Sequence, residues 1–197
     1  MKRITHSLSW LVLLGLCLIV ASAQQPQKLA APTSFASGFR ADLLAYCDDF
    51  SKKMISLAEA TPQEKYSWRP GEGVRSVGEV FTHVASGNFW YMQMAGIQPP
   101  AGLDLKAVDS LKEKAKIIEI LKLSCEHVRL AISKSSDADL EKPAKVFGRD
   151  GTVRQVFFLL ATHQPEHLGQ SIAYARMIGV VPPWTAERQA QQPSPKK

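Results

Sequence analysis

Four long segments of this sequence repeat apolar residues at the spacing of an amphipathic helix. They run over about residues 34–60, 76–95, 110–133 and 152–179. Apolar side chains three and four positions apart form a stripe along one side of a helix, and that stripe must be buried against another element. The pattern therefore predicts an all-α fold in which four helices pack together as a bundle.

Capping residues indicate where two of these helices begin. Ser76 with Glu79, and Thr152 with Gln155, have the spacing of a capping box, in which each side chain bonds the backbone of the other residue. We therefore expect the second and fourth helices to start directly after Ser76 and Thr152. Between the third and fourth helices, residues 134–151 should be irregular apart from one turn of helix.

The link between the second and third helices has a length that matters for topology. Residues 97–109 contain a proline pair and a glycine, which favours a connection rather than a helix. A link of about 13 residues reaches about 40 Å, whereas a helix of about 20 residues is about 30 Å long. We therefore expect a long crossover that returns along the bundle, so that the third helix can start parallel to the second.

The first 23 residues differ from the rest of the chain. Two basic residues precede an apolar run over residues 8–20, and small residues follow up to Ala23. This is the pattern of a secretory signal peptide, and the apolar run is shorter than the about 20 residues of a membrane-spanning helix. We therefore expect a periplasmic or secreted protein that contacts a membrane only if this segment stays uncleaved.

Composition fits one globular domain after that segment. The chain has 197 residues, of which 45% are hydrophobic and 21% charged. We expect a flexible lead-in over residues 24–33, the bundle domain over 34–185 and a disordered tail over 186–197. Loss of residues 1–23 removes two basic and no acidic residues, which lowers the formal net charge from +6 to +4. Basic residues alternate with acidic ones along the chain, so we expect no nucleic-acid partner.

Two cysteines remain after the first 23 residues, Cys47 and Cys125. Both fall on the apolar faces of their helices, which predicts two buried thiols. A disulfide between them is the alternative, because exported proteins fold in an oxidising compartment.

Three histidines lie on apolar helix faces. His163 and His167 are four residues apart, so they project from the same face one turn apart. His83 shares its face of the second helix with apolar residues. A single inward histidine is more often a satisfied core residue than a ligand, but three of them on two packed helices match the way that bundles build metal sites. His127 lies off the apolar stripe of its helix, and we expect it in solvent.

Residues 163–167 read His-Gln-Pro-Glu-His, which also fits the H-x-x-E-H pattern of inverted zincin proteases. The 30 residues after His167 end in a polar tail and leave little room for a third ligand and a protease subdomain, so we reject that fold. One residue rotates a helix by about 100°, which favours solvent or a partner helix as the direction of Glu166. A general-base role for Glu166 is the alternative. Pro165 predicts a kink between the two histidines.

Two motifs together resemble the DinB/YfiT-like superfamily. Residues 78–83 read Gly-Glu-Val-x-x-His, and residues 163–179 read His-x-x-x-His-x-Gly-Gln-x-x-x-Tyr-x-Arg-x-x-Gly. The resemblance extends over about residues 35–185. It implies an up-down-down-up four-helix bundle that holds a divalent metal ion through three histidines. By position, these are His83, His163 and His167.

The three-histidine set favours an enzyme. Neutral imidazoles leave a divalent ion with its full charge and an open coordination position, and zinc, nickel, iron, manganese and copper all accept such ligands. We expect a metal-dependent hydrolase, or a transferase to a small nucleophile, with an unknown small-molecule substrate.

Two other functions stay open. One is a metal or small-ligand binding module without catalysis, and the other is a helical interaction protein whose histidines bind no metal. A homodimer is compatible with any of these functions. Tyr174, one turn beyond the histidines, is either a wall or hydrogen-bond donor of the site or part of the core.

Overall fold

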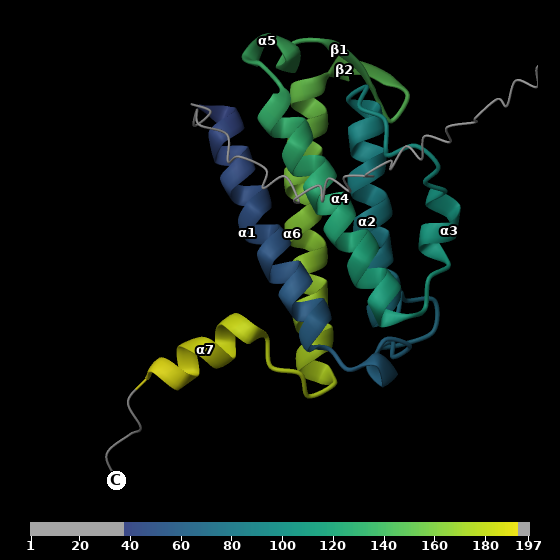
Figure 1. Ribbon diagram of the computed structural model, residues 1–197, viewed down its shortest axis with the longest axis vertical. Coiled ribbons are helices and arrows are strands. Elements are labelled where there is room, and N and C mark those ends of the chain that lie inside the picture. The colour runs from purple at the N-terminus through teal and green to yellow at the C-terminus, as the bar shows by residue number, and fades with distance from the viewer. Residues whose placement is uncertain (1–37, 193–197) are drawn as a thin grey trace, which may run out of the picture. The chain divides into compact units, whose positions relative to one another are not determined.

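The computed structural model describes residues 38–192, and four long helices form most of this region (Figure 1). The four helices are α1 (Phe39–Ala60), α2 (Val77–Met94), α4 (Lys114–Lys134) and α6 (Val153–Met177). In Figure 1, α1 and α6 run in one direction and α2 and α4 in the other. The expected up-down-down-up bundle is therefore confirmed. The expected signal peptide and lead-in, together with residues 193–197, lie outside the described residues.

Both predicted capping boxes are present. The Ser76 hydroxyl accepts from the backbone N–H of Glu79, and the Glu79 carboxylate accepts from the backbone N–H of Ser76. Thr152 and Gln155 make the same reciprocal pair at the start of α6. These caps satisfy amide groups that a helix start otherwise leaves without partners, so they fix the first residue of each site-bearing helix.

The crossover from α2 to α4 contains a short helix that we did not expect. This helix, α3 (Leu105–Asp109), is capped by Asp104, whose carboxylate accepts from the backbone N–H of Lys106. Its Val108 side chain is buried in the core beside α2. Burial of one apolar residue therefore orders the middle of the link, and α4 starts at Lys114 rather than at residue 110.

A hairpin precedes α6 where we expected irregular chain. After the predicted helical turn, α5 (Asp137–Leu140), strand β1 (Pro143–Val146) pairs antiparallel with β2 (Arg149–Thr152), with Val146 opposite Arg149. The two turn residues, Phe147 and Gly148, have φ of 49° and 80°. A two-residue turn of this kind is normally formed by Asn-Gly or Gly-Gly. The Phe-Gly sequence therefore gave no signal from which the hairpin could be predicted.

The tail also differs from expectation. Residues 186–197 were predicted to be disordered, but helix α7 (Pro183–Gln191) includes the first of them. Pro183 occupies the first position of this helix. Proline at the first position of a helix is in fact favourable, because that position needs no backbone donor.

A buried polar network ties together the three helices around the histidines. Asn88, Ser124 and Gln164 are fully buried, on α2, α4 and α6 respectively. The Asn88 amide donates to Ser124 Oγ over 3.1 Å and accepts from Gln164 Nε2 over 3.1 Å. Because buried polar groups need partners, this network restricts how the helices can slide past one another. Gln164 directly follows His163, so the network helps to fix its position.

The two cysteines that follow residue 23 lie in the core of the bundle. Cys47 and Cys125 are free and buried, as their helical positions predict. Burial raises the pKa of the Cys47 thiol to about 12, so this group is a thiol rather than a thiolate at neutral pH.

Within residues 38–192, every helix is too short or too polar to cross a membrane.

Candidate metal centre

The structure brings His83, His163 and His167 together between α2 and α6. One nitrogen of each ring lies within 4.8 Å of the corresponding nitrogens of the others. His83 Nε2 and His163 Nε2 are separated by 3.3 Å. Two zinc–nitrogen bonds of about 2.0–2.1 Å at a tetrahedral angle place their nitrogens about 3.3–3.4 Å apart. These two atoms therefore already have the separation of two ligands on one ion.

Gly87 makes this convergence possible. It lies one turn after His83 on α2, and a Cβ atom at this position would lie 2.8 Å from His163 Cε1. Ordinary side chains do not approach a carbon atom so closely, so the missing side chain makes room for the His163 ring. One turn further along α2, the Tyr91 ring packs against His163 with 5.2 Å between their centroids.

Gln170 holds the third histidine. Its Oε1 atom lies 2.9 Å from His167 Nδ1, and its Nε2 atom donates to the Tyr174 hydroxyl over 3.0 Å. Because the amide oxygen can only accept, His167 Nδ1 carries the proton and Nε2 keeps its lone pair for a ligand. Tyr174 is buried and packs edge-on against Trp68. Of our two alternatives for Tyr174, core packing is the one observed, and its hydroxyl also anchors Gln170.

Burial keeps two of the imidazoles neutral. Desolvation is the main cause that lowers the pKa of His83 to about 4 and that of His163 to about 4. The charge of Arg75 lowers both values further. Neutral rings offer the lone pairs that metal binding needs, without loss of a proton at pH 7.

The donor set fits a divalent ion better than it fits a plain core. The three imidazole rings are in contact, but only one pair of their nitrogens, in His83 and His163, is within hydrogen-bond distance among the described residues. Ring nitrogens in this cluster therefore lack hydrogen-bond partners, which costs free energy in a plain core. A shared ion would engage one lone pair from each ring. The cluster therefore suggests a divalent metal site.

Two residues outside the cluster were also assigned positions from the sequence: the prediction for Glu166 is confirmed and the one for His127 is wrong. Glu166 is exposed on α6, and α6 continues through Pro165 as one helix. The solvent position that we expected for His127 is wrong. Its Nε2 atom is buried, and its ring lies 5.4 Å from the Phe89 ring. Ile97 and the two residues before it, which follow α2, line the same cavity as His127.

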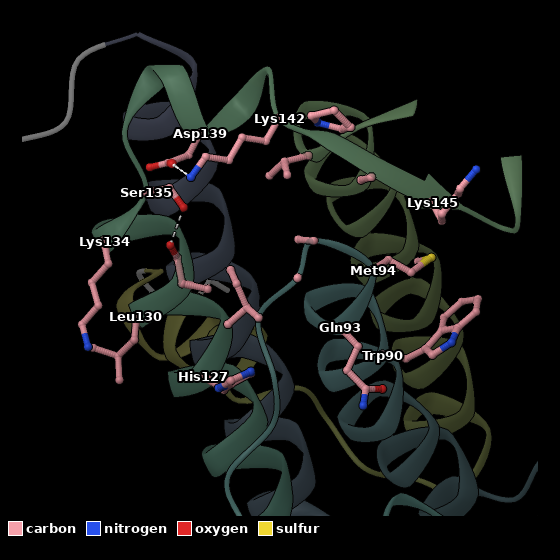
Figure 2. Close-up of a pocket in the computed structure, with 17 residues that line it drawn as sticks. Trp90, Gln93, Met94, His127, Leu130, Lys134, Ser135, Asp139, Lys142 and Lys145 are labelled. Atoms are coloured by element: carbon pink, nitrogen blue, oxygen red, sulfur yellow. Dashed lines mark hydrogen bonds and ion pairs between the residues drawn. The ribbon is translucent and has the colours of Figure 1, made fainter. Parts of the chain in front are cut away.

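That cavity, of about 1060 Å³, lies at the hairpin end of the bundle (Figure 2). It is lined by residues of α2, α4, α5, β1 and the start of α6 and by residues 95–97, and by none of the three clustered histidines. The cluster is instead a partly exposed site on the side of the bundle, because His83 and His163 retain some exposure while His167 is 7% exposed.

The sequence pattern of the DinB superfamily matches residues 48–171, which include all three histidines. The chain belongs to the DinB superfamily. Among curated protein sequences, none matches it significantly.

Solved structures share the DinB fold with this chain. A DinB-like protein from Bacillus cereus is 19% identical, with a TM-score of 0.64, over 72% of this chain and 93% of that one. A DinB-like protein from Bacillus subtilis is also 19% identical, with a TM-score of 0.57, over 71% and 93%. YfiT from Bacillus subtilis, described as a probable metal-dependent hydrolase with an unusual four-helix bundle topology, is 15% identical, with a TM-score of 0.57, over 77% and 94%. At these identities the likeness establishes the DinB fold alone.

Residue type and spacing identify the three histidines of this DinB bundle but not the roles of Gly87 and Gln170. A glycine on an apolar helix face, one turn from His83, was the available signal for close helix approach. Gln170 stood in the motif, but its role depends on a contact with His167 that only the structure shows.

We expect Gln170→Leu to lower metal affinity by about 10- to 100-fold, because His167 loses the acceptor that fixes its tautomer and ring orientation. Competition with a chromophoric chelator measures this change. Gln170→Glu keeps an acceptor oxygen at the same place and should retain most of the affinity. Equal affinities for the Leu variant and the native protein would contradict this role.

Proposed function

We propose that this protein is an exported DinB-superfamily metalloenzyme. It binds one divalent ion through His83, His163 and His167 and catalyses hydrolysis of a small molecule, or group transfer to a small nucleophile. The observation that supports this proposal most strongly is the convergence of three histidines, with two Nε2 atoms 3.3 Å apart, between the two helices that carry them.

The proposed chemistry follows from the donor set. A divalent ion held by three neutral imidazoles polarises a substrate oxygen or lowers the pKa of a bound water. Gln170 holds the His167 ring in the tautomer that leaves Nε2 free. The partial exposure of His83 and His163 lets a small molecule reach the site from solvent. Zinc, nickel, iron and manganese all suit imidazole ligands.

A covalent route through a cysteine is not part of this proposal. Cys47 and Cys125 are buried in the core, and burial raises the pKa of both thiols. Neither belongs to the histidine cluster. A thiol that stays protonated and inaccessible is a poor nucleophile, so the reacting group is carried by the substrate or by water.

The test is a substrate screen with two controls. Protein loaded with zinc, nickel, iron or manganese is assayed against esters, amides, lactones and electrophiles with small thiols. The same assays are run on chelated protein and on His83→Ala. Activity that needs both the metal and His83 supports the proposal, whereas activity that survives chelation and the substitution contradicts it.

One observation favours a second function, a metal-binding module without catalysis. Three cavities among the described residues, of about 1060, 560 and 540 Å³, are lined by residues other than the three histidines. A site without a deep pocket offers little to hold a substrate. Stoichiometric metal binding together with no turnover across the screen would favour this function over the enzyme.

Export is proposed from the sequence alone. The signal-peptide pattern over residues 1–23 lies outside the residues that the structure describes. The supporting feature is the order of basic start, apolar run and small residues up to Ala23. Intact-mass measurement of protein from the cell envelope should show a chain that lacks residues 1–23. A full-length chain that stays in the cytoplasm would contradict export.

A further inference from the structure

A row of aromatic rings leads away from the histidine cluster. Tyr91 packs against His163 with ring centroids 5.2 Å apart, and Trp90 lies 5.5 Å from Tyr91. Phe147, at the tip of the hairpin, lies 5.3 Å from Trp90. We call Tyr91, Trp90 and Phe147 the aromatic row. It joins two elements, α2 and the β1–β2 turn, to a residue of the candidate metal centre.

The outer part of the row is exposed. Tyr91 is only 7% exposed, but Trp90 is 44% exposed and Phe147 is 57% exposed. Figure 2 shows the Trp90 ring extending away from the α2 backbone. Large aromatic side chains that stay in contact with water lose the main benefit of burial, and such patches commonly mark binding sites.

The backbone at Phe147 strengthens this interpretation. Its φ of 49° places it in the left-handed region, which bulky residues rarely adopt and which suits asparagine or glycine in this turn. Burial does not compensate, because more than half of the Phe147 side chain is exposed. A strained residue that gains little from packing is a reason to look for a function. Here the strain holds an aromatic ring beside Trp90.

Continuity with the metal centre indicates what the row binds. Its inner member touches His163, and on α2 the residues His83, Gly87 and Trp90 follow one another along the same side of the helix. A molecule whose reacting group lies at the three histidines can therefore extend along α2 toward the hairpin tip. The next surfaces it meets are the exposed rings of Trp90 and Phe147.

We infer that Trp90 and Phe147 bind the aromatic or other flat apolar group of the substrate. The substrate class is a small molecule in which such a group is joined by a short linker to an oxygen or sulfur that reaches the metal. This inference rests on the metal site of the proposed function. Offset and edge-on ring contacts supply the affinity for the apolar end, and the histidine site supplies the chemistry.

Hydroxamates test the inference because their two oxygens bind zinc and their tails can be varied. Isothermal titration calorimetry on zinc-loaded protein compares acetohydroxamate with 4-phenylbutanohydroxamate. We expect the phenyl tail to raise affinity by about tenfold in the native protein. Trp90→Ala and Phe147→Asn should each remove that gain and leave the affinity for acetohydroxamate unchanged.

The variants are chosen to keep the fold. Asparagine adopts the left-handed conformation readily, so Phe147→Asn should preserve or strengthen the hairpin while it removes the ring. Tyr46→Ala is the matched control, because Tyr46 is an aromatic residue on α1 with 41% exposure that lies outside the row. It should keep the full gain from the phenyl tail.

The outcomes separate the two proposals. If acetohydroxamate binds but the phenyl tail adds no affinity, or if the gain survives both substitutions, the aromatic row is not the binding surface and the inference is overturned. If acetohydroxamate does not bind to protein incubated with zinc, the metal site itself is wrong, and the inference that rests on it is also overturned.

Discussion

His163→Ala is expected to lower the metal content of the dialysed protein from about one ion per chain to close to zero. The ring that it removes contributes the nitrogen 3.3 Å from His83 Nε2. Two imidazoles on their own hold a divalent ion weakly, because each coordinate bond carries a large share of the binding free energy. Elemental analysis after dialysis measures the change, and His83→Ala and His167→Ala should behave in the same way.

His127→Ala is the matched control for these ligand variants. His127 is also a half-buried histidine on a bundle helix, but it lies outside the cluster. This variant should keep its full metal content. Stoichiometric metal in a protein that carries both His163→Ala and His167→Ala would refute the ligand assignment.

Gly87→Ala should lower metal affinity by at least about tenfold without loss of the fold. The added methyl group would lie 2.8 Å from His163 Cε1, so the imidazole ring must turn away from His83. Because alanine stabilises a helix interior relative to glycine, the metal-free variant should be as stable as the native protein, or more stable by up to about 1 kcal/mol. Chelator competition and denaturant unfolding measure the two effects separately.

Gly169→Ala provides the comparison for this substitution. Gly169 lies within α6 one residue before Gln170, and a Cβ atom there meets nothing within 4 Å. Gly169→Ala should raise helix stability as much as Gly87→Ala does and leave metal affinity unchanged. If Gly87→Ala binds metal as tightly as the native protein, the close approach of α2 to His163 does not shape the site.

The parts of the fold that the sequence predicted correctly depend on local signals. Ser76 and Thr152 mark helix starts because each capping box involves residues only three positions apart. The apolar stripes likewise depend on helical period alone. The same locality made the histidines predictable, since His163 and His167 share a face of any regular helix.

The parts that the sequence did not predict depend on contacts between distant residues or on unusual local choices. The hairpin was missed because Phe147 occupies a turn position where glycine or asparagine is the usual signal. We did not predict helix α7, because the polar residues after residue 185 favoured a disordered tail, although proline suits the first position of a helix. His127 was placed in solvent because its helix pattern carries no information about the chain that follows α2.

In the candidate site, too, local sequence predicts some features, and others depend on contacts between helices. Residue type and spacing identified the three ligand candidates, but the 3.3 Å approach of His83 to His163 depends on how closely α2 and α6 pack. Gly87 sets that packing distance, and no pattern within α2 alone shows which residue would lie against it. The hydrogen bond from His167 to Gln170 likewise depends on side-chain conformations.

The most direct measurement is a crystal structure of the zinc-loaded protein with anomalous diffraction data collected at the zinc absorption edge. We expect one strong anomalous peak between α2 and α6, about 2.0–2.1 Å from the Nε2 atoms of His83, His163 and His167. A peak bound elsewhere, for example at His127, with the three clustered histidines free of metal, would contradict it.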